Sequence, residues 1–360
     1  MDMSNTYVDK RDADNVEKLE RILENDLPDF CREYFVGISS NTTPLTRLNY
    51  AYDLRTFFKY LTTKIYRLKG KGTKDITPID IEGLSPFEVE AYLNYVEIYK
   101  DDEGNIVKNS ARGKSRKLSA IRSMVKYFEK KQIIRFNPTA SVDTPKLREK
   151  EIIRLEGDEI GAMLDVVDTG NGLTDRQLKY QENTRIRDLA MVSLLLGTGI
   201  RVSELVGIDV SDVNFEDMSF LITRKGGARV ILYFSEEVAG YLYDYYRMRT
   251  ADSTLKKEPA LFLSLQRRRI TTRAVENIVK KYASIASPLK HITPHKLRST
   301  YGTQLYRNTG DIYVVADVLG HKDVNTTKRH YAAITEDIRR SAASKVSLRG
   351  AVKPKKDEDD

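Results

Sequence analysis

The sequence predicts a mainly α protein of two domains with one small antiparallel β-sheet. Apolar residues recur every three to four positions through most of the chain, which is the period of an amphipathic helix. Two short β-rich runs, 219–223 and 229–234, flank the Gly-containing turn 224–227, a pattern typical of a β-hairpin. The stretch 138–154 has two prolines and no helical stripe, so it separates an all-helical first part from a mixed second part as a linker.

The first part is expected to contain helices at 15–24, 44–63, 86–99 and 115–131. Thr43 and Pro44 give the second of these a cap and a favourable first turn. The segment 101–110 is interpreted as a polar loop. The last helix has an apolar stripe made of Leu118, Ile121, Met124, Val125 and Phe128. Its opposite face is expected to carry the basic side chains of Arg116, Lys117, Arg122 and Lys126.

The second part is expected to begin with a short helix at 158–167, followed by a polar insertion at 168–183. A strongly apolar helix is predicted at 187–196, before the hairpin. Further helices are predicted after the hairpin, at 235–249, 272–287, 293–308 and 312–319. The charged end of the chain, 353–360, has no apolar periodicity and is expected to be disordered.

Composition indicates the class of partner and argues against a membrane protein. The 360 residues carry a net charge of +8, which indicates an anionic partner without naming one. There is no apolar run of roughly 18 residues or more, so we expect no membrane span. The chain begins with polar residues and lacks the apolar core of a signal peptide. The single cysteine, Cys31, fits a reducing cytosol, and we expect a cytoplasmic, nucleoid-associated protein.

Two segments around the predicted hairpin carry residues suited to chemistry on a phosphate. In the segment 197–205, Arg201 and Glu204 are three residues apart at the start of a helix, so the carboxylate can hold the guanidinium in place. Lys225 lies in the hairpin turn. Taken alone, an Arg-x-x-Glu pair is usually a surface ion pair, and a lysine beside two glycines is as often a simple turn residue.

Two further segments lie closer to the C-terminus. His295 and Arg298 are three apart on a helix that begins with Thr293 and Pro294, so they face the same way. His321 follows Leu319-Gly320, and Tyr331 comes ten residues later. His291 and His330 are interpreted as structural or surface residues.

Together, two arginines, a lysine, two histidines and a tyrosine suit attack on a phosphodiester. Two guanidiniums can clamp the non-bridging oxygens and stabilise the charge that builds up in the transition state. A tyrosine hydroxyl has a pKa near 10 and needs a base or electrostatic help to become a nucleophile. Histidine can accept its proton near neutral pH, and lysine can protonate the departing sugar oxygen.

The segments 199–205, 293–300 and 319–321, with Tyr331, resemble the signature boxes of the tyrosine recombinases, which include Xer recombinases, phage and transposon integrases, and Cre. The boxes occur in the family's order with comparable gaps. The resemblance is close in the second part and looser in the first, which resembles the family's core-binding domain. It implies a helical core-binding domain and a mixed α/β catalytic domain that form a C-shaped clamp on duplex DNA.

By the same resemblance, the catalytic set, supported by Glu204, is Arg201, Lys225, His295, Arg298, His321 and Tyr331. The two arginines bind the scissile phosphate and His321 donates to it. Lys225 is the general acid for the 5′ oxygen, and His295 assists proton transfer at Tyr331. Tyr331 forms a 3′-phosphotyrosine, and the freed 5′ hydroxyl attacks a partner strand through a Holliday junction. No metal, ATP or other cofactor is implied, because the phosphotyrosine link keeps the bond energy.

The expected domains are a helical extension at 1–27, a SAM-like core-binding domain at 28–137, the linker at 138–154, a catalytic domain at 155–345 and a tail at 347–360. Residues about 334–346 carry apolar side chains at four-residue spacing, and in the family such a helix docks into the neighbouring protomer. We therefore expect a homotetramer on double-stranded recombination sites, with a related recombinase subunit or an accessory protein as further candidate partners. Packing of this helix on its own domain is the alternative.

The distance from His321 to Tyr331 departs from the family pattern. Many members have one residue fewer there, which would place His330 at the nucleophile position, and an extra residue turns a helix by roughly 100°. Tyr331 is still assigned as the nucleophile because no other tyrosine follows Tyr313. Two alternative functions stay open: type IB topoisomerase-like strand passage, and a DNA-binding relative with impaired catalysis. The chain is also longer than a minimal Xer enzyme, which favours a mobile-element integrase over a chromosome-dimer resolvase.

The DNA-contacting residues are predicted from charge. On charge alone, the basic face of helix 115–131 is more often a solvated surface. Beside a site that attacks phosphate, contact with the DNA backbone becomes the better interpretation. The expected contacts are Thr46, Arg47, Tyr50, Arg116, Lys117, Arg122 and Arg224.

Overall fold

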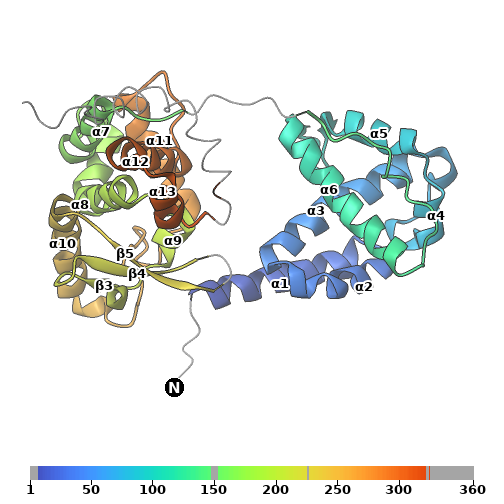
Figure 1. Ribbon diagram of the computed structural model, residues 1–360, viewed down its shortest axis with the longest axis horizontal. Coiled ribbons are helices and arrows are strands. Elements are labelled where there is room, and N and C mark those ends of the chain that lie inside the picture. The colour runs from blue at the N-terminus through green and yellow to red at the C-terminus, as the bar shows by residue number, and fades with distance from the viewer. Residues whose placement is uncertain (1–6, 147–152, 225–226, 322–323, 325–360) are drawn as a thin grey trace, which may run out of the picture. The chain divides into compact units, whose positions relative to one another are not determined.

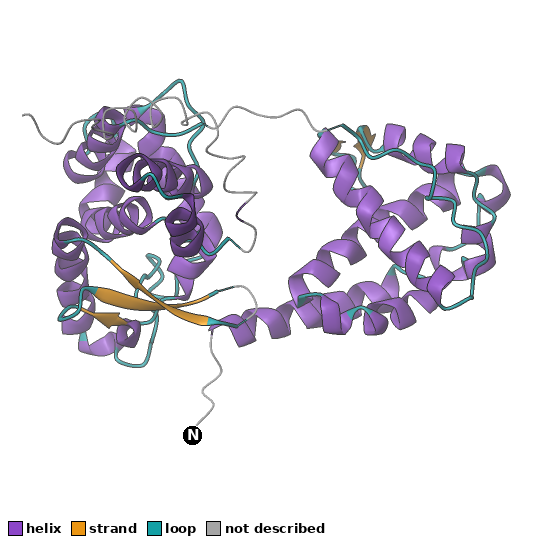
Figure 2. Cartoon of the chain, in the orientation of Figure 1, coloured by secondary structure: helices purple, strands orange, loops and turns teal. Residues whose placement is uncertain are grey.

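The computed structural model describes residues 7–146, 153–224, 227–321 and 324, and the chain divides into two compact units, residues 1–150 and 151–360 (Figure 1). Helices make up most of both units, and each unit also contains one small antiparallel sheet (Figure 2). The predicted fold class, mainly α with a small antiparallel β component, is confirmed. In the described part of the chain, we find no helix with the length and apolar character needed to span a membrane.

Unit 1 is built from α1 (Tyr7–Asn25), α2 (Phe30–Gly37), α3 (Pro44–Lys64), α4 (Pro78–Glu82), α5 (Pro86–Tyr95) and α6 (Ala111–Lys130). Short 3-10 turns lie between them, at Ser39–Asn41, Tyr66–Leu68 and Thr73–Asp75. The helix starts are set locally. The Thr43 hydroxyl accepts the backbone N–H of Thr46 at 3.3 Å, and Ser85 and Glu88 form a capping box on α5.

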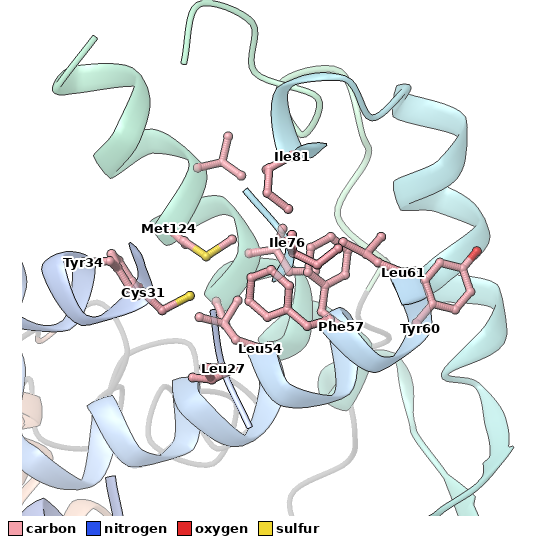
Figure 3. Close-up of a cluster of buried hydrophobic side chains, with 14 of the residues drawn as sticks. Leu27, Cys31, Tyr34, Leu54, Phe57, Tyr60, Leu61, Ile76, Ile81 and Met124 are labelled. Atoms are coloured by element: carbon pink, nitrogen blue, oxygen red, sulfur yellow. The ribbon is translucent and has the colours of Figure 1, made fainter. Parts of the chain in front are cut away.

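The core of unit 1 is aromatic and draws on all of its longer helices. Phe57 and Tyr92 are fully buried, with ring centroids 5.1 Å apart in an edge-to-face arrangement. Leu27, Cys31, Leu54 and Met124 lie in the same cluster (Figure 3). Because α1 also buries Leu19, Ile22 and Leu23 here, the predicted extension at 1–27 shares the core of the unit.

Unit 1 differs from the sequence prediction in several places. The predicted loop 101–110 is wrong: it contains β2 (Ile106–Lys108), which pairs antiparallel with β1 (Ile98–Lys100). Asp101 makes this turn by accepting the N–H groups of Glu103 and Asn105 at 3.0 and 2.8 Å. Helices α2 and α4 were not predicted, because eight and five residues give too short a pattern. The helix predicted at 86–99 is too long, because α5 ends at Tyr95 and β1 begins at Ile98. The predicted linker starts inside the unit, since Thr139 and Val142 are buried.

Unit 2 begins with α7 (Gly157–Thr169), α8 (Asp175–Thr198) and α9 (Val202–Gly207). A three-stranded sheet follows, in the order β3 (Val213–Asn214), β4 (Ser219–Thr223) and β5 (Arg229–Tyr233). The unit ends in α10 (Glu236–Ala251), α11 (Thr272–Ala286), α12 (Pro294–Thr309) and α13 (Ile312–Leu319). Strands β4 and β5 pair antiparallel, which confirms the predicted hairpin.

Helix α8 is the central element of unit 2, because α7, α10 and α12 all pack on it. The sequence predicted a polar insertion up to residue 183 and a helix only from 187, and this is wrong: the helix begins at Asp175. Thr174 caps it in a capping box with Gln177, and the amide of Gln181 donates to the Val167 carbonyl at 2.8 Å. The first half of α8 contains polar residues that bond to neighbouring backbone, so a pattern based on apolar residues does not reveal it.

Candidate active site

The end of α8 turns the chain into the first site segment. Gly199 closes the helix with φ +62°, a left-handed conformation that favours glycine. A Cβ at this position would overlap the Tyr301 ring and lie 3.0 Å from Leu319 Cδ2. The turn therefore packs directly on α12 and α13, and the chain then enters α9 at Arg201.

Arg201 and Glu204 hold each other as the sequence predicts. Arg201 Nη1 donates to Glu204 Oε1 at 2.8 Å, and the Arg201 backbone N–H donates to Oε2 at 2.8 Å. The carboxylate side chain is 3% exposed and the arginine side chain 36%. A buried anion thus orients a guanidinium that still reaches solvent, which is the arrangement needed to bind an external anion.

Helix α12 supplies the second arginine. Thr293 precedes the helix and Pro294 occupies its first turn. Arg298 is buried, and its Nη1 donates to the Gly199 carbonyl at 2.6 Å while its Nη2 donates to the Leu319 carbonyl. One guanidinium therefore joins the turn after α8 to the end of α13. His295 lies one turn earlier on the same helix and is exposed.

The end of α13 brings in His321. Gly320 takes φ +61°, and the N–H groups of Gly320 and His321 turn back to the carbonyls of Asp317 and Ala316 at 2.8 and 2.9 Å. Arg201 Nη2 donates to the Gly320 carbonyl at 3.3 Å. The structure thus brings Arg201, Arg298 and His321 together at one turn.

Arg224, at the end of β4, reaches the same turn. Its Nη2 donates to the Val318 carbonyl at 2.8 Å and its Nη1 donates to the Asp317 carbonyl at 3.4 Å. Sequence reasoning placed this residue only among the DNA contacts. No sequence signal reveals its partners, because every residue has a carbonyl and only the folded chain selects which ones are left without a bond.

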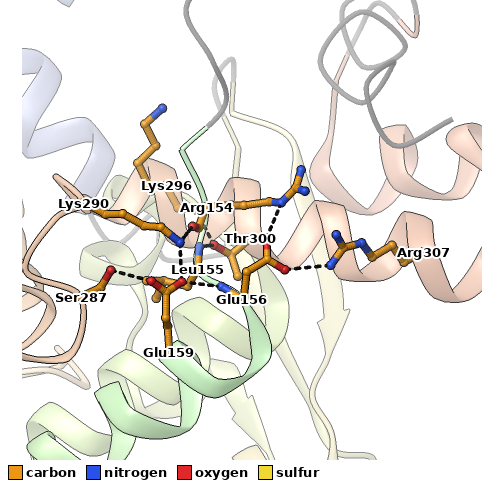
Figure 4. A network of polar contacts seen from close by, with 9 residues as sticks. All are labelled: Arg154, Leu155, Glu156, Glu159, Ser287, Lys290, Lys296, Thr300 and Arg307. Carbon is orange, nitrogen blue, oxygen red and sulfur yellow. Dashed lines mark hydrogen bonds and ion pairs between the residues drawn. The ribbon is translucent and has the colours of Figure 1, made fainter. Parts of the chain in front are cut away.

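The start of unit 2 is fastened to the helix that carries His295 and Arg298 (Figure 4). The Leu155 N–H donates to the Thr300 hydroxyl at 3.0 Å, and Glu156 accepts from Arg307 Nη1 at 3.0 Å. Hydrogen bonds from Arg154 and Arg307 hold the pKa of Glu156 below its usual range. On the neighbouring helix, Glu159 accepts from Ser287 and Lys290 at 2.7 and 2.5 Å. This network fixes the first residues after the linker on α12.

The predicted DNA face of unit 1 needs one correction. Lys117 is not exposed: its side chain is buried, and its Nζ lies 3.1 Å from Oδ1 of the buried Asp53. The helix turns this residue toward α3, where a buried carboxylate balances the charge. Arg116 is 48% exposed and pairs with the other oxygen of Asp53 at 2.6 Å. Arg122 donates to the Thr144 hydroxyl at 2.6 Å and to the Val142 carbonyl.

The remaining predicted contacts of unit 1 lie at the start of α3 and are partly exposed. Thr46 shares a hydrogen bond with the Thr43 hydroxyl at 2.9 Å, and Arg47 Nη1 donates to the Thr42 carbonyl at 2.8 Å. Tyr50 packs its ring against the core of the unit.

Lys225, Tyr331 and the helix expected at 334–346 lie outside the described residues. The described residues contain no group of three or more histidine, cysteine, aspartate and glutamate side chains that could hold a metal ion.

A family model described as the phage integrase family matches residues 153–337. The tyrosine recombinase XerC of Caldanaerobacter subterraneus subsp. tengcongensis is 31% identical over 322 residues, which cover 88% of this chain and 85% of the relative. The tyrosine recombinase XerS of Lactococcus lactis subsp. cremoris is 29% identical, with 90% of this chain and 96% of the relative covered. Both similarities extend across the two units.

Solved structures show the same fold. The XerH site-specific recombinase bound to palindromic difH substrate, a post-cleavage complex, has a TM-score of 0.63 at 17% identity and covers 84% of this chain and 80% of that one. A lambda integrase tetramer bound to a Holliday junction has a TM-score of 0.58 at 16% identity, with 84% and 76% covered.

Proposed function

The chain belongs to the phage integrase family and is a tyrosine site-specific DNA recombinase, and we propose that Tyr331 is the nucleophile with which it cuts DNA. We assign the roles around it residue by residue. Arg201 and Arg298 bind the scissile phosphate and His321 donates to it. Lys225 is the general acid, His295 assists proton transfer at Tyr331, and Glu204 orients Arg201.

The reaction exchanges one phosphodiester for another. The Tyr331 hydroxyl loses its proton, with His295 assisting, and its oxygen bonds to phosphorus. The bond from phosphorus to the 5′ oxygen breaks, and Lys225 supplies a proton to that oxygen, which leaves as a hydroxyl. The two guanidiniums and His321 stabilise the negative charge that builds up on the non-bridging oxygens. The reverse reaction with a 5′ hydroxyl from a partner strand completes the exchange.

One observation carries this proposal. Three residues far apart in sequence, Arg201, Arg298 and His321, meet at the last turn of α13, and no stretch of local sequence forces that meeting. Arginine forks and an imidazole gathered at one place match the charge and geometry of a phosphoryl group in transfer.

The test is covalent trapping on a nicked suicide substrate. Wild-type protein should form a covalent protein–DNA adduct, and Tyr331→Phe should abolish it while DNA binding is kept. Tyr313→Phe is the matched control, because Tyr313 is 71% exposed and lies on α13 outside the site. An adduct that persists in Tyr331→Phe refutes the nucleophile assignment.

The arginine roles need their own measurement. Arg201→Lys and Arg298→Lys keep the positive charge but lose the planar fork, so they should bind DNA nearly as well as wild type and cleave it at least about 100-fold more slowly. Unimpaired cleavage in either variant refutes the phosphate clamp.

We further propose that the protein assembles as a homotetramer on double-stranded recombination sites and that residues 334–346 dock into the neighbouring protomer. The tetramer in the lambda integrase structure supports this arrangement for a protein of the same fold. Removing the residues after Ala333 should weaken assembly on a synthetic Holliday junction, measured by analytical ultracentrifugation. Unchanged assembly would mean that this helix packs within its own chain. A second recombinase subunit or an accessory protein remains a candidate partner on the same sites.

Unit 1 is proposed as the core-binding domain and unit 2 as the catalytic domain of the DNA clamp. Within unit 1 we retain Thr46, Arg47, Tyr50, Arg116 and Arg122 as DNA contacts and leave out the buried Lys117. A variant that loses one phosphate contact should bind DNA more weakly. The salt dependence of its DNA-binding constant should fall by the equivalent of about one phosphate contact. Because DNA is the substrate, we also propose that the protein associates with the nucleoid, which fluorescence microscopy of a tagged chain can test.

The relatives also bear on the alternatives. They are recombinases, which favours strand exchange over type IB topoisomerase-like passage and over an impaired DNA-binding protein. The length of the chain does not favour a mobile-element enzyme, because the alignment with XerS of Lactococcus lactis covers 96% of that relative. We propose that the protein is an Xer-type resolvase. The first DNA substrate to test is therefore a palindromic site of chromosome-dimer resolution.

A further inference from the structure

Within the described residues, the last turn of α13 leaves several carbonyl groups without helical partners. The N–H groups of Gly320 and His321 return to Asp317 and Ala316, so no backbone N–H of the described residues pairs with the carbonyls of Val318, Leu319 and Gly320. A helix also concentrates partial negative charge at its C-terminus. This turn therefore attracts cationic donors, and it is the turn from which His321 emerges.

Three arginines from three different elements bind successive carbonyls of this turn. Arg298 of α12 donates to Leu319 and Arg201, at the start of α9, donates to Gly320. Arg224, at the end of β4, donates to Val318 and Asp317. Two of the three are the proposed phosphate clamp. The third has no role in the reaction as described above.

We propose that Arg224 is a positioning residue that fastens the β4–β5 hairpin to the end of α13 and so sets the position of the general acid relative to His321. This rests on the proposed role of Lys225, which is the residue bonded directly to Arg224 and lies outside the described residues. The Arg224 N–H donates to the Ala228 carbonyl at 2.8 Å, so Arg224 is the last paired residue before the hairpin loop. A tether on its side chain restrains the point where that loop begins.

The fit of Arg224 against Gly320 supports a positioning role. A Cβ at residue 320 would lie 2.5 Å from Arg224 Cζ and 2.9 Å from its Nε, so the guanidinium occupies the space that a side chain at residue 320 would need. The Nε atom is buried, and both terminal nitrogens already donate to carbonyls. Each terminal nitrogen keeps a second N–H, as in the two clamp arginines, so a phosphate contact is tested directly by the variants below.

The experiment compares cleavage of two suicide substrates that carry either oxygen or sulfur at the bridging 5′ position. A sulfur leaving group departs without a proton, so it removes the need for a general acid. At saturating protein, Arg224→Ala should cleave the oxygen substrate about 10–100-fold more slowly, since a misplacement near 1 Å costs about that much. It should cleave the sulfur substrate at a rate within about 3-fold of the wild-type rate, which corresponds to a small change in the activation barrier.

Two further variants separate the tether from a phosphate contact. Arg224→Gln keeps a neutral donor for the Val318 carbonyl, so a tether predicts a faster variant than Arg224→Ala, and the salt dependence of DNA binding should not change. A phosphate contact predicts instead that Gln is as slow as Ala, that Lys is faster than both, and that the salt dependence falls by about one charge. Those results, or wild-type cleavage by Arg224→Ala, overturn the proposal.

The controls distinguish this proposal from the one on which it rests. Arg229→Ala is the matched control, because Arg229 pairs with Thr223 across the same hairpin and its exposed guanidinium lies 3.7 Å from Asp212. It should cleave both substrates like wild type. Lys225→Ala must also be rescued by sulfur; if it is not, the general-acid assignment fails. If sulfur restores cleavage by Lys225→Ala but not by Arg224→Ala, the tether is refuted while the general-acid assignment stands. Thermal unfolding confirms that each variant is folded.

Discussion

Replacing Glu204 by alanine should release Arg201 and slow DNA cleavage, because this carboxylate makes two hydrogen bonds to that residue. Oε1 accepts from the guanidinium and Oε2 from the backbone N–H, both at 2.8 Å. The carboxylate is almost fully buried, so water cannot replace it at the backbone donor. The variant leaves one part-buried N–H without this acceptor, and among the described residues the guanidinium keeps its bond to the Gly320 carbonyl.

The size of the effect follows from these contacts. A hydrogen bond to a charged group is worth about 1.5–3 kcal/mol, and the exposure of Arg201 puts its bond at the lower end. Loss of the helix start adds about 1 kcal/mol, so the free energy of unfolding should fall by about 2–3 kcal/mol. For a unit of this size that lowers Tm by about 4–12 °C. Cleavage should slow by up to about 100-fold, since the guanidinium loses its orientation.

Thermal unfolding and adduct formation on the suicide substrate measure the two effects. Glu204→Gln keeps an acceptor for the backbone N–H and should lose less on both scales. Glu276→Ala is the matched control, because Glu276 also pairs with an arginine three residues away, Arg273, but on an exposed helix face. It should change stability by less than about 0.5 kcal/mol. If Glu204→Ala unfolds and cleaves like Glu276→Ala, the orienting role of Glu204 is wrong.

Three further predictions concern stability. Asp53→Ala should lower the free energy of unfolding by about 3–5 kcal/mol in denaturant titrations, because it leaves the buried Lys117 charge unpaired. Asp102→Ala, which removes an exposed ion pair, should have almost no effect, and equal losses in the two variants would contradict the prediction. Arg154 and Arg307 lower the pKa of Glu156, so the ionised carboxylate stabilises the fold at neutral pH, and this contribution is lost as pH falls through the lowered pKa. Glu156→Gln should therefore show a smaller fall in Tm than wild type between about pH 5 and 3, and parallel curves of Tm against pH for the two proteins would refute this. Gly199→Ala should destabilise unit 2 by more than about 1–2 kcal/mol, because of backbone strain at φ +62° and overlap of the new Cβ with Tyr301. Gly240→Ala, where a Cβ meets open space, should not destabilise it, and a Gly199→Ala variant as stable as wild type would refute the close approach of Gly199 to Tyr301.

Local chemistry fixed several features that can be read directly from the residues. The Thr43 cap and Pro44 determine where α3 begins, because capping depends on residues within one turn. Pro294 favours the first turn of α12, although the Thr293 side chain forms no capping bond there. The pairing of Arg201 with Glu204 follows from three-residue spacing at a helix start. The types and order of the site residues also sufficed to predict the reaction class, since few other tasks use such a set.

The tertiary structure alone decided which groups meet. Arg298 binds the carbonyl of Gly199, 99 residues away, and Arg224 binds that of Val318, 94 residues away. Carbonyls are identical in every residue, so only the packing of α13 against β4 and α12 selects them. Lys117 is a different case: it lies four residues before Ile121 and seven before Met124, so helical spacing already places it on the apolar stripe, and only its partner, the buried Asp53 of α3, is decided by packing. Sequence spacing sets neighbours within a helix, whereas the packing of one helix on another sets partners across the fold.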